Sequence, residues 1–543
     1  MIDRDPAAAL EPVRAYHALS KHRPDRYAPG PGHLDWANQP DPFRRFAGCE
    51  TVALPLLADR PSPRFAALAQ PPQTPAVLDR AGVAQLFELA LGLSAWKAAG
   101  PSRWALRCNP SSGNLHPTEG YLVCPGLPDL APGLYHYDSY RHCLERRAAL
   151  AADEHWRAAC AGNLLVGLSG IHWREAWKYG ARAWRYCQHD AGHAIGALRY
   201  AAATLGWGAR LLTAPGDAEI AALLGLDRSA DFLGAEPEAA ELLLVIGPRP
   251  GAADPGAQLT PPPSAVWQGR ANRLSSAQVD WPQIGAVAAA TGKPRSAPCS
   301  EPPLPLPPPA ATAGDMSAVD LIRRRRSAVA FDGRTRMPAQ AFFALLDALL
   351  PRADRAPWDV LPWQPRIHPV LFVHRVEGLA AGLYALPRSP AAADRLRGAL
   401  SAEFGWEPVA GAPAQLPLHR LLAGDSRDLA RALACHQDIA ADSCFALAML
   451  GDFEASLARG PHWYRWLFWE AGLLGQVLYL QAEALGLRGT GIGCYFDDAV
   501  HQVLGLADDR WQDLYHFTVG SPVEDQRLRT EPPYAHLGDR GHA

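Results

Sequence analysis

The chain carries the same long pattern twice, 280 positions apart. Residues 184–192 read Trp-Arg-Tyr-Cys-Gln-His-Asp-Ala-Gly, and residues 464–472 read Tyr-Arg-Trp-Leu-Phe-Trp-Glu-Ala-Gly. The register continues without a gap to residues 224–226 and 504–506, which both read Leu-Gly-Leu. Similarity over so long a register indicates a duplicated structural unit. The sequence therefore predicts two copies of one fold within a single chain.

Shorter matches, less regular in spacing, extend the repeat toward the start of each copy. The arginine-containing segment 323–331 parallels residues 60–65, and residues 382–386 parallel the turn and strand at residues 133–137. Helices alternate with short apolar strands, which predicts an α+β unit. We divide the 543 residues into an arm (1–50), a first unit (51–250), a proline-rich linker (251–315) and a second unit (316–543).

Apolar periodicity places the main elements of the first unit. A helix is predicted over residues 80–96, where Val83, Phe87 and Ala90 share one face, and it parallels a predicted helix over residues 339–350. A longer helix is predicted over residues 181–206, and buried strands over residues 120–124 and 242–246. The arm is expected to be mostly irregular and pinned by its aromatic residues. The linker is expected to be semi-rigid and to lack a core of its own.

Composition excludes several classes of protein. The net charge of −3 predicts no general attraction to nucleic acid or to an anionic membrane, and no apolar run approaches the ~20 residues of a membrane span. The first five residues open no signal peptide. Ten scattered cysteines without a Cys-x-x-Cys pair predict reduced thiols in a cytoplasmic protein, and neither a disulfide framework nor a metal site.

One loop in the first unit is dense in turn-forming residues. Residues 110–119 read Pro-Ser-Ser-Gly-Asn-Leu-His-Pro-Thr-Glu and lead directly into the predicted strand at 120–124. Small side chains and backbone donors fixed to a core strand suit close contact with a flat, polar ligand. An ordinary surface loop has the same composition, and the residues alone do not separate these two interpretations.

The second unit has different features in the corresponding places. Four arginines, 323–326, precede Ser327, and Gly491 and Gly493 follow the long helix, where the first unit reads Ala-Arg-Leu-Leu-Thr. Arginine forks and a hydroxyl suit a terminal phosphate, and glycines let backbone amides approach a ring system. Taken alone, the arginines are equally consistent with a solvated helix start or a partner patch.

The segment 173–186 of the first unit is rich in aromatic residues and contains Lys178 and Tyr179. On residues alone, this pair is an amphipathic helix start with snorkelling ends. Asp190 and His193 follow at a spacing of one helical turn. A structural hydrogen bond or helix packing is favoured over a catalytic role for them. A metal site is not expected, because the sequence offers no evident third ligand.

These segments together resemble the nitroreductase superfamily and, more narrowly, its SagB/ThcOx-type dehydrogenases. The resemblance covers nearly the whole chain outside the linker, including the leader phrases in residues 16–40 and the closing segment 522–529. In this family two units embrace and build FMN sites between them, so the fused chain would imitate a dimer. The resemblance implies one FMN site with contributions from both units: Ser111, Ser112, Asn114, His116, Arg324, Arg326, Ser327, Gly491, Gly493 and either Arg527 or Arg529.

The resemblance also implies a chemistry. Lys178 and Tyr179 match the Lys-Tyr pair that handles the substrate proton in the azoline oxidases, while FMN takes a hydride from a small-molecule or modified-peptide substrate. A partner protein could deliver the peptide. Two alternatives remain open, an NAD(P)H-dependent nitro or quinone reductase and a flavin-binding or flavin-free partner subunit. The second, mirror-image site, which would use Arg60, Ser62 and Arg64, is expected to be empty.

Overall fold

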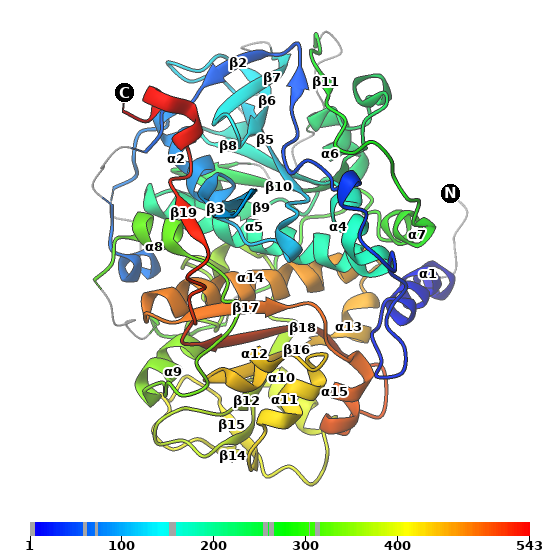
Figure 1. Ribbon diagram of the computed structural model, residues 1–543, viewed down its shortest axis with the longest axis vertical. Helices are drawn as coiled ribbons and strands as arrows, with labels where there is room; N and C mark the ends of the chain where they lie inside the picture. Colours follow the sequence, from blue (N-terminus) through cyan, green and yellow to red (C-terminus); the bar gives the residue numbers. More distant parts are fainter. Residues whose placement is uncertain are drawn as a thin grey trace.

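The computed structural model describes residues 6–57, 62–70, 74–150, 159–253, 259, 265–302, 304–309 and 315–542. Two sheets of seven strands form the frame of the protein (Figure 1). The first has the order β2 (Glu50–Ala53), β7 (Cys143–Ala149), β6 (Gly133–Asp138), β5 (Thr118–Cys124), β8 (Leu164–Gly170), β10 (Ala239–Gly247) and β9 (Gly208–Leu211). The second has the order β14 (Glu407–Pro408), β15 (His419–Ala423), β13 (Gly382–Ala385), β12 (Ile367–Val373), β16 (Phe445–Asp452), β18 (Trp511–Gly520) and β17 (Arg488–Ile492).

The last four strands of each sheet follow one plan: the strand pairs are antiparallel, and the edge strand directly follows a 22-residue helix. The central strands β5, β8, β12 and β16 are buried along their whole length, because helices cover them. The prediction of two α+β units in one chain is confirmed.

The two long helices, α5 (Ala183–Thr204) and α14 (Trp463–Ala484), pack against each other between the sheets (Figure 1). Both are buried on almost every side, which explains why neither has a polar face. They meet at Gly192 and Gly472, where a Cβ on either residue would lie 2.9 Å from the Cα of the other. Because these glycines are 280 positions apart, the duplicated units are related by an approximate two-fold axis through this crossing.

The remaining helices are distributed around this frame. They are α1 (Pro6–Leu19), α2 (Arg80–Ala90), α4 (His172–Tyr179), α6 (Asp217–Leu224), α7 (Pro282–Ala290), α8 (Ala318–Arg324), α9 (Ala339–Asp347), α10 (Pro390–Arg397), α11 (Arg427–Leu433), α12 (Asp438–Asp442), α13 (Phe453–Leu457) and α15 (Asp497–Leu504). A two-stranded ribbon joins β1 (Phe46–Ala47) to β11 (Arg270–Ala271). No helix in the described part of the chain is long and apolar enough to span a membrane.

The C-terminal end of the second unit crosses onto the first. Strand β19 (Arg529–Glu531) pairs with β3 (Leu93–Ala99), which pairs in turn with β4 (Ser102–Arg107). This ribbon corrects the predicted helix 80–96, which ends at Ala90. The apolar spacing continues into β3, but pairing with β4 and β19 satisfies its backbone and fixes it as a strand.

The arm and the linker contain more regular structure than predicted. Alanine-rich residues 6–19 form α1, and its buried Val13, Tyr16 and His17 supply the packing that a short helix needs. The linker contains α7, whose Ile284 and Val287 belong to the main core. The proline run 261–263 lies outside the described residues.

Candidate functional site

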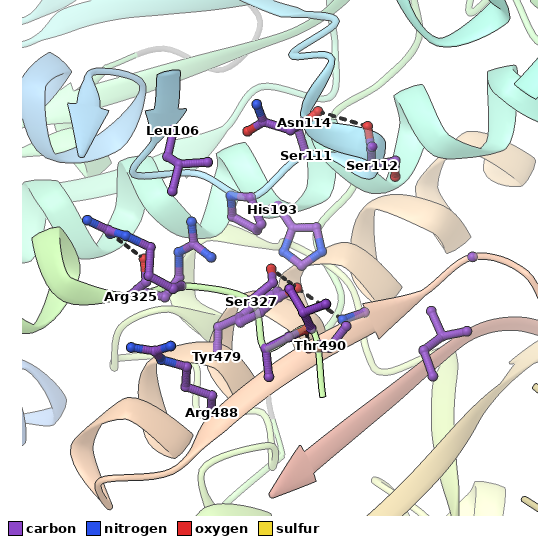
Figure 2. Close-up of a pocket in the computed structure, with 18 of the residues that line it drawn as sticks. Leu106, Ser111, Ser112, Asn114, His193, Arg325, Ser327, Tyr479, Arg488 and Thr490 are labelled. Carbon is purple, nitrogen blue, oxygen red and sulfur yellow. Dashed lines mark hydrogen bonds between the residues drawn. The ribbon is translucent and has the colours of Figure 1, made fainter. Parts of the chain in front are cut away.

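A cavity of about 480 Å³ lies between the two units (Figure 2). Its upper wall in the figure is the loop that carries Ser111, Ser112 and Asn114, and its lower wall comes from the second unit around Ser327 and Thr490. His193 of α5 lies between these walls. The cavity therefore uses residues from both units, and neither unit could form it alone.

Hydrogen bonds within the first-unit loop and from the loop to neighbouring elements fix its conformation. Asn114 donates to the carbonyl of Ala105 (2.9 Å), and its side-chain oxygen lies 3.0 Å from Nε2 of His116. The amide of His116 donates to the hydroxyl of Ser111 (2.8 Å). Both the amide and the hydroxyl of Ser112 donate to Asp190, at 3.1 and 3.2 Å. All four predicted loop residues line the cavity, and their mutual bonds give its wall a fixed shape.

Lys178 and Tyr179 lie over the tip of this loop. Gly113 has φ +60°, and a Cβ there would lie 2.7 Å from the Tyr179 hydroxyl and 3.2 Å from the Lys178 ammonium. Glycine is therefore required both by the backbone and by the close approach of these two groups. Tyr179 lines the cavity, and its ring meets that of Tyr186 edge-on. Lys178 is half-buried and is not among the lining residues. Burial raises the pKa of Tyr179 well above its usual value.

The opposite end of the cavity is cationic. Lys97, Arg325, Arg326 and Arg488 all line it. Burial, and to a lesser extent repulsion from Arg325, lowers the pKa of Arg326 to about 10. Burial, and to a lesser extent repulsion from Arg326, also lowers the pKa of Lys97. Glu524 and Glu483 lie 2.6 and 4.0 Å from Arg488, whereas Lys97, Arg325 and Arg326 form no ion pair with any carboxylate of the described residues. Such a cluster is an anion site, because arginine forks and an ammonium suit phosphate oxygens.

Of the predicted arginines, Arg326 lines the cavity, whereas Arg324 and Arg527 do not. Arg324 is exposed, and Arg527 is exposed and paired with its neighbour Asp525; neither lines the cavity. Arg325 does line it, and its guanidinium donates to the carbonyls of Arg107 and Cys108 in the first unit while lying over the ring of Tyr479. Because helix α8 ends at Arg324, the chain direction changes there and turns the next side chain inward.

The sequence analysis missed Lys97 and Arg488. Lys97 lies on the strand that was predicted as the end of a helix, so its direction could not be inferred. Arg488 directly precedes the glycine segment, and that position was the available signal. The first unit has Gly208 at the corresponding position, which shows that this arginine belongs to the second unit's side of the site only.

Ser327 and Gly491 both hydrogen-bond to the hydroxyl of Tyr479, and Gly493 lies against a different tyrosine, Tyr186. The hydroxyl of Tyr479 lies 2.9 Å from that of Ser327 and accepts the Gly491 amide at 3.0 Å. A Cβ on Gly491 would lie 2.0 Å from the Tyr515 hydroxyl, and one on Gly493 would lie 2.3 Å from the ring of Tyr186. The glycines thus admit aromatic side chains from both units, and the amide of Gly491 is already bonded.

Asp190 and His193 both line the cavity, but their partners are different groups. Asp190 holds the loop through Ser112, and burial raises its pKa to about 7. His193 lies 3.0 Å from the Tyr515 hydroxyl, and burial lowers its pKa to about 3. The completely buried Glu175 has a raised pKa because of burial and the charge of Asp190. The described residues contain no cluster of three or more groups that could hold a metal ion.

The two-fold counterpart of the cavity wall is packed with tryptophan. Trp363 stacks on Trp466, the counterpart of Tyr186, with ring centroids 4.7 Å apart. Its indole donates to Glu470, the counterpart of Asp190, at 3.2 Å. We call this place the mirror position. Of the residues expected there, Arg60 lies outside the described residues, and Arg64 pairs with Asp315.

Comparison with known proteins identifies the family. The nitroreductase family matches residues 74–237 and 379–521, which is more than half of the chain and one segment in each unit. The chain belongs to the nitroreductase family. No curated protein sequence matches it.

One solved structure shares the fold over nearly the whole chain. A nitroreductase-like protein from Anabaena variabilis is 23% identical, with a TM-score of 0.69, and the alignment covers 94% of this chain and 99% of that one. Shorter proteins align with about one unit. The Escherichia coli microcin synthetase complex McbBCD is 20% identical over 41% of this chain and 78% of its own, with a TM-score of 0.28. A nitroreductase-like protein from Exiguobacterium sibiricum in complex with FMN is 12% identical over 39% and 91%, with a TM-score of 0.25.

Proposed function

We propose that this member of the nitroreductase family is an FMN-dependent oxidoreductase with one flavin site, formed between its two units. The observation that carries the proposal is the cationic cluster of Lys97, Arg325, Arg326 and Arg488 at one end of the cavity, in which only Arg488 has a carboxylate partner among the described residues. It matches the phosphate of FMN, which is the charged group of that cofactor. The family membership supports a flavin, because nitroreductase family proteins bind flavin.

The lining residues fit the rest of FMN. Ser327 and Thr490 lie next to the cationic cluster and suit the ribityl hydroxyls. The loop residues Ser111, Ser112, Asn114 and His116, with Gly491 and Gly493 opposite, would face the ring system. When bound, FMN supplies a two-electron acceptor that takes a hydride from a substrate carbon.

The protein's own residues would accept the substrate proton and exclude water from the site. Because burial raises the pKa of Tyr179, its phenol keeps its proton and acts as a hydrogen-bond donor beside Gly113. Lys178, whose Nζ lies 5.3 Å from the centre of the Tyr179 ring, would then take the substrate proton in its neutral amine form. The aromatic rings of Tyr179, Tyr186 and Tyr515 shield this end of the cavity from water.

The Lys178–Tyr179 pair favours a dehydrogenase of the SagB/ThcOx type, acting on a carbon–heteroatom or carbon–carbon bond of a peptide-derived or small-molecule substrate. Azoline oxidation is the reaction that this pair performs in that group, where a partner protein can deliver the peptide. The ten free thiols suit the reducing cytoplasm. An NAD(P)H-dependent nitro or quinone reductase is the second candidate, favoured by the family match. A flavin-free partner subunit is the third, since stacked tryptophans occupy the mirror position.

Anaerobic reduction of the bound flavin tests these candidates. We expect a thiazoline-containing peptide to bleach the flavin and NADH or NADPH to leave it oxidised. Rapid bleaching by NAD(P)H, followed by turnover with a quinone, would replace the dehydrogenase with the reductase. Protein that binds no FMN when FMN is supplied in excess would leave only the partner subunit.

A further inference from the structure

Two cysteines face each other at the wall of the cavity. Their sulfur atoms lie 2.7 Å apart, although the residues are 59 positions apart in the chain. Cys494 follows β17 and lines the cavity directly after Gly493, and Cys435 follows α11 in the left-handed region, with φ +52°. Both are half-buried, so small molecules can reach them from solvent.

Backbone hydrogen bonds hold the two cysteine-bearing loops together. The amide of Phe496 donates to the carbonyl of Leu433 (2.8 Å), and the side-chain amide of Gln437 donates to the carbonyl of Cys494 (3.0 Å). These bonds lie on both sides of the sulfur contact. These bonds keep the two sulfurs close to each other.

The surroundings make Cys494 the nucleophile of the pair. Nδ1 of His22 accepts the amide of Ala28 (2.9 Å), so the proton of the neutral ring is on Nε2, and the His22 side chain hydrogen-bonds to Cys494. The hydrogen bond between the two sulfurs lowers the pKa of Cys494 to about 5, and His22 and Arg182 add to this effect. The pKa of Cys435 is raised. Cys494 is thus the thiolate at neutral pH, and Cys435 keeps its proton.

We propose that Cys435 and Cys494 form a redox-active dithiol that closes to a disulfide by exchange with small-molecule disulfides. The Cys494 thiolate attacks the small disulfide, forms a mixed disulfide and releases one thiolate, which takes the proton of Cys435. The Cys435 thiolate then attacks the Cys494 sulfur and releases the second small thiolate. Two electrons pass from the cysteine pair to the small disulfide, and an excess of small thiol reverses both steps.

Closure changes the wall of the cavity. The disulfide ties the loop after β17, which follows the glycine segment, to the loop after α11, which supplies Gln437. It also removes a thiolate from the cavity lining. The proposal does not depend on bound flavin, because both steps use only the two cysteines and the small disulfide.

The test uses the full chain in buffers that contain glutathione and glutathione disulfide. The protein is then denatured in the presence of N-ethylmaleimide, so that the buried thiols are also alkylated, and analysed by peptide mass spectrometry. We expect eight of the ten cysteines to be alkylated in oxidising buffer and the 435 and 494 peptides to be linked. All ten should be alkylated after excess glutathione is added. Ten alkylated cysteines in oxidising buffer, or linkage of a different pair, would overturn the proposal.

Three serine variants assign the two steps. Cys435→Ser should retain one glutathione on Cys494, because the second step is lost. Cys494→Ser should leave Cys435 unmodified over the same time. Cys299→Ser is the matched control, since Cys299 is also half-buried but has Arg459 as its neighbour, and it should close the pair at the wild-type rate. Equal glutathione labelling in both single variants of the pair would contradict the assigned roles.

Discussion

The backbones of Gly192 and Gly472 touch where the two long helices cross. A Cβ on Gly192 would lie 2.3 Å from the carbonyl oxygen of Trp469, and one on Gly472 would lie 2.2 Å from that of His189. Trp469 and His189 are themselves 280 positions apart, so the contact is the same when viewed from either unit. The duplicated halves thus pack as the subunits of a symmetric dimer would.

Side chains at this crossing should destabilise the protein. We expect Gly472→Val to force the helices apart and lower the free energy of unfolding by at least ~1–3 kcal/mol, which is the usual cost of overpacking a core. Thermal unfolding followed by circular dichroism measures it. Gly285→Ala is the control, because Gly285 of α7 has open space at its Cβ position and alanine favours the helix. An unchanged melting temperature for Gly472→Val would contradict the close packing.

The cationic cluster should select for phosphate. We expect Arg326→Ala to weaken FMN binding by at least about tenfold, because a charge-assisted hydrogen bond is lost. Binding of riboflavin, which lacks the phosphate, should change little. Flavin fluorescence titration measures both affinities. Arg324→Ala is the matched control from the same arginine run, and its exposed side chain predicts unchanged binding of either flavin. Equal losses for FMN and riboflavin would place the phosphate elsewhere.

Lys178 and Tyr179 should affect the reaction and not the binding of FMN. With a thiazoline-containing peptide, we expect Lys178→Met to slow anaerobic flavin reduction by at least ~100-fold, the usual contribution of a general base. Tyr179→Phe keeps the ring against Tyr186 and should cause a smaller loss. Stopped-flow absorbance measures the rates, and the FMN affinity of both variants should stay within about twofold of wild type. A wild-type rate for Lys178→Met would remove it from the chemistry.

Asp190 should make the stability of the flavin-free protein depend on pH. Burial raises its pKa from an ordinary value near 4 to about 7, so the folded state holds a proton that the unfolded state has released. The stabilisation is complete below pH ~4 and is lost as the pH rises toward 7.

Asp190→Asn cannot ionise, and its amide oxygen can still accept from Ser112. We therefore expect the variant's melting temperature to fall less than that of wild type between pH 4.5 and 7.5. Because the charge of Asp190 also raises the pKa of Glu175, both proteins are compared in a Glu175→Gln background. Parallel pH curves for the two proteins would show that Asp190 is ionised throughout.

The repeat made much of the fold predictable. The match between residues 184–192 and 464–472 predicts both long helices and the two-unit plan, because the buried helix pattern is long and unbroken. The strand β3 was missed because its apolar spacing continues that of α2, although its hairpin partner β4 follows directly. Its second partner, β19, comes from the other end of the chain, and no local pattern records that pairing. Helix α1 likewise depends on packing by Val13 and Tyr16 against distant segments.

The site residues on the loop 110–119 were predictable. The residues whose role depends on the direction in which a side chain points were not. The loop residues Ser111 and Asn114 line the cavity because a short loop can adopt few conformations. The sequence does not tell which of four successive arginine side chains point into the cavity. Arg325 does so because α8 ends directly before it. The packing of Trp363 on Trp466 required the three-dimensional relation between the units.

The central claim is that the two units build one flavin site and that the mirror position is closed. Its most direct test is the amount of FMN bound per chain, measured by absorbance after the purified, FMN-saturated protein is denatured. We predict one FMN per chain. Two per chain would show that the tryptophan-packed mirror position also binds flavin, and none would contradict the flavin site itself.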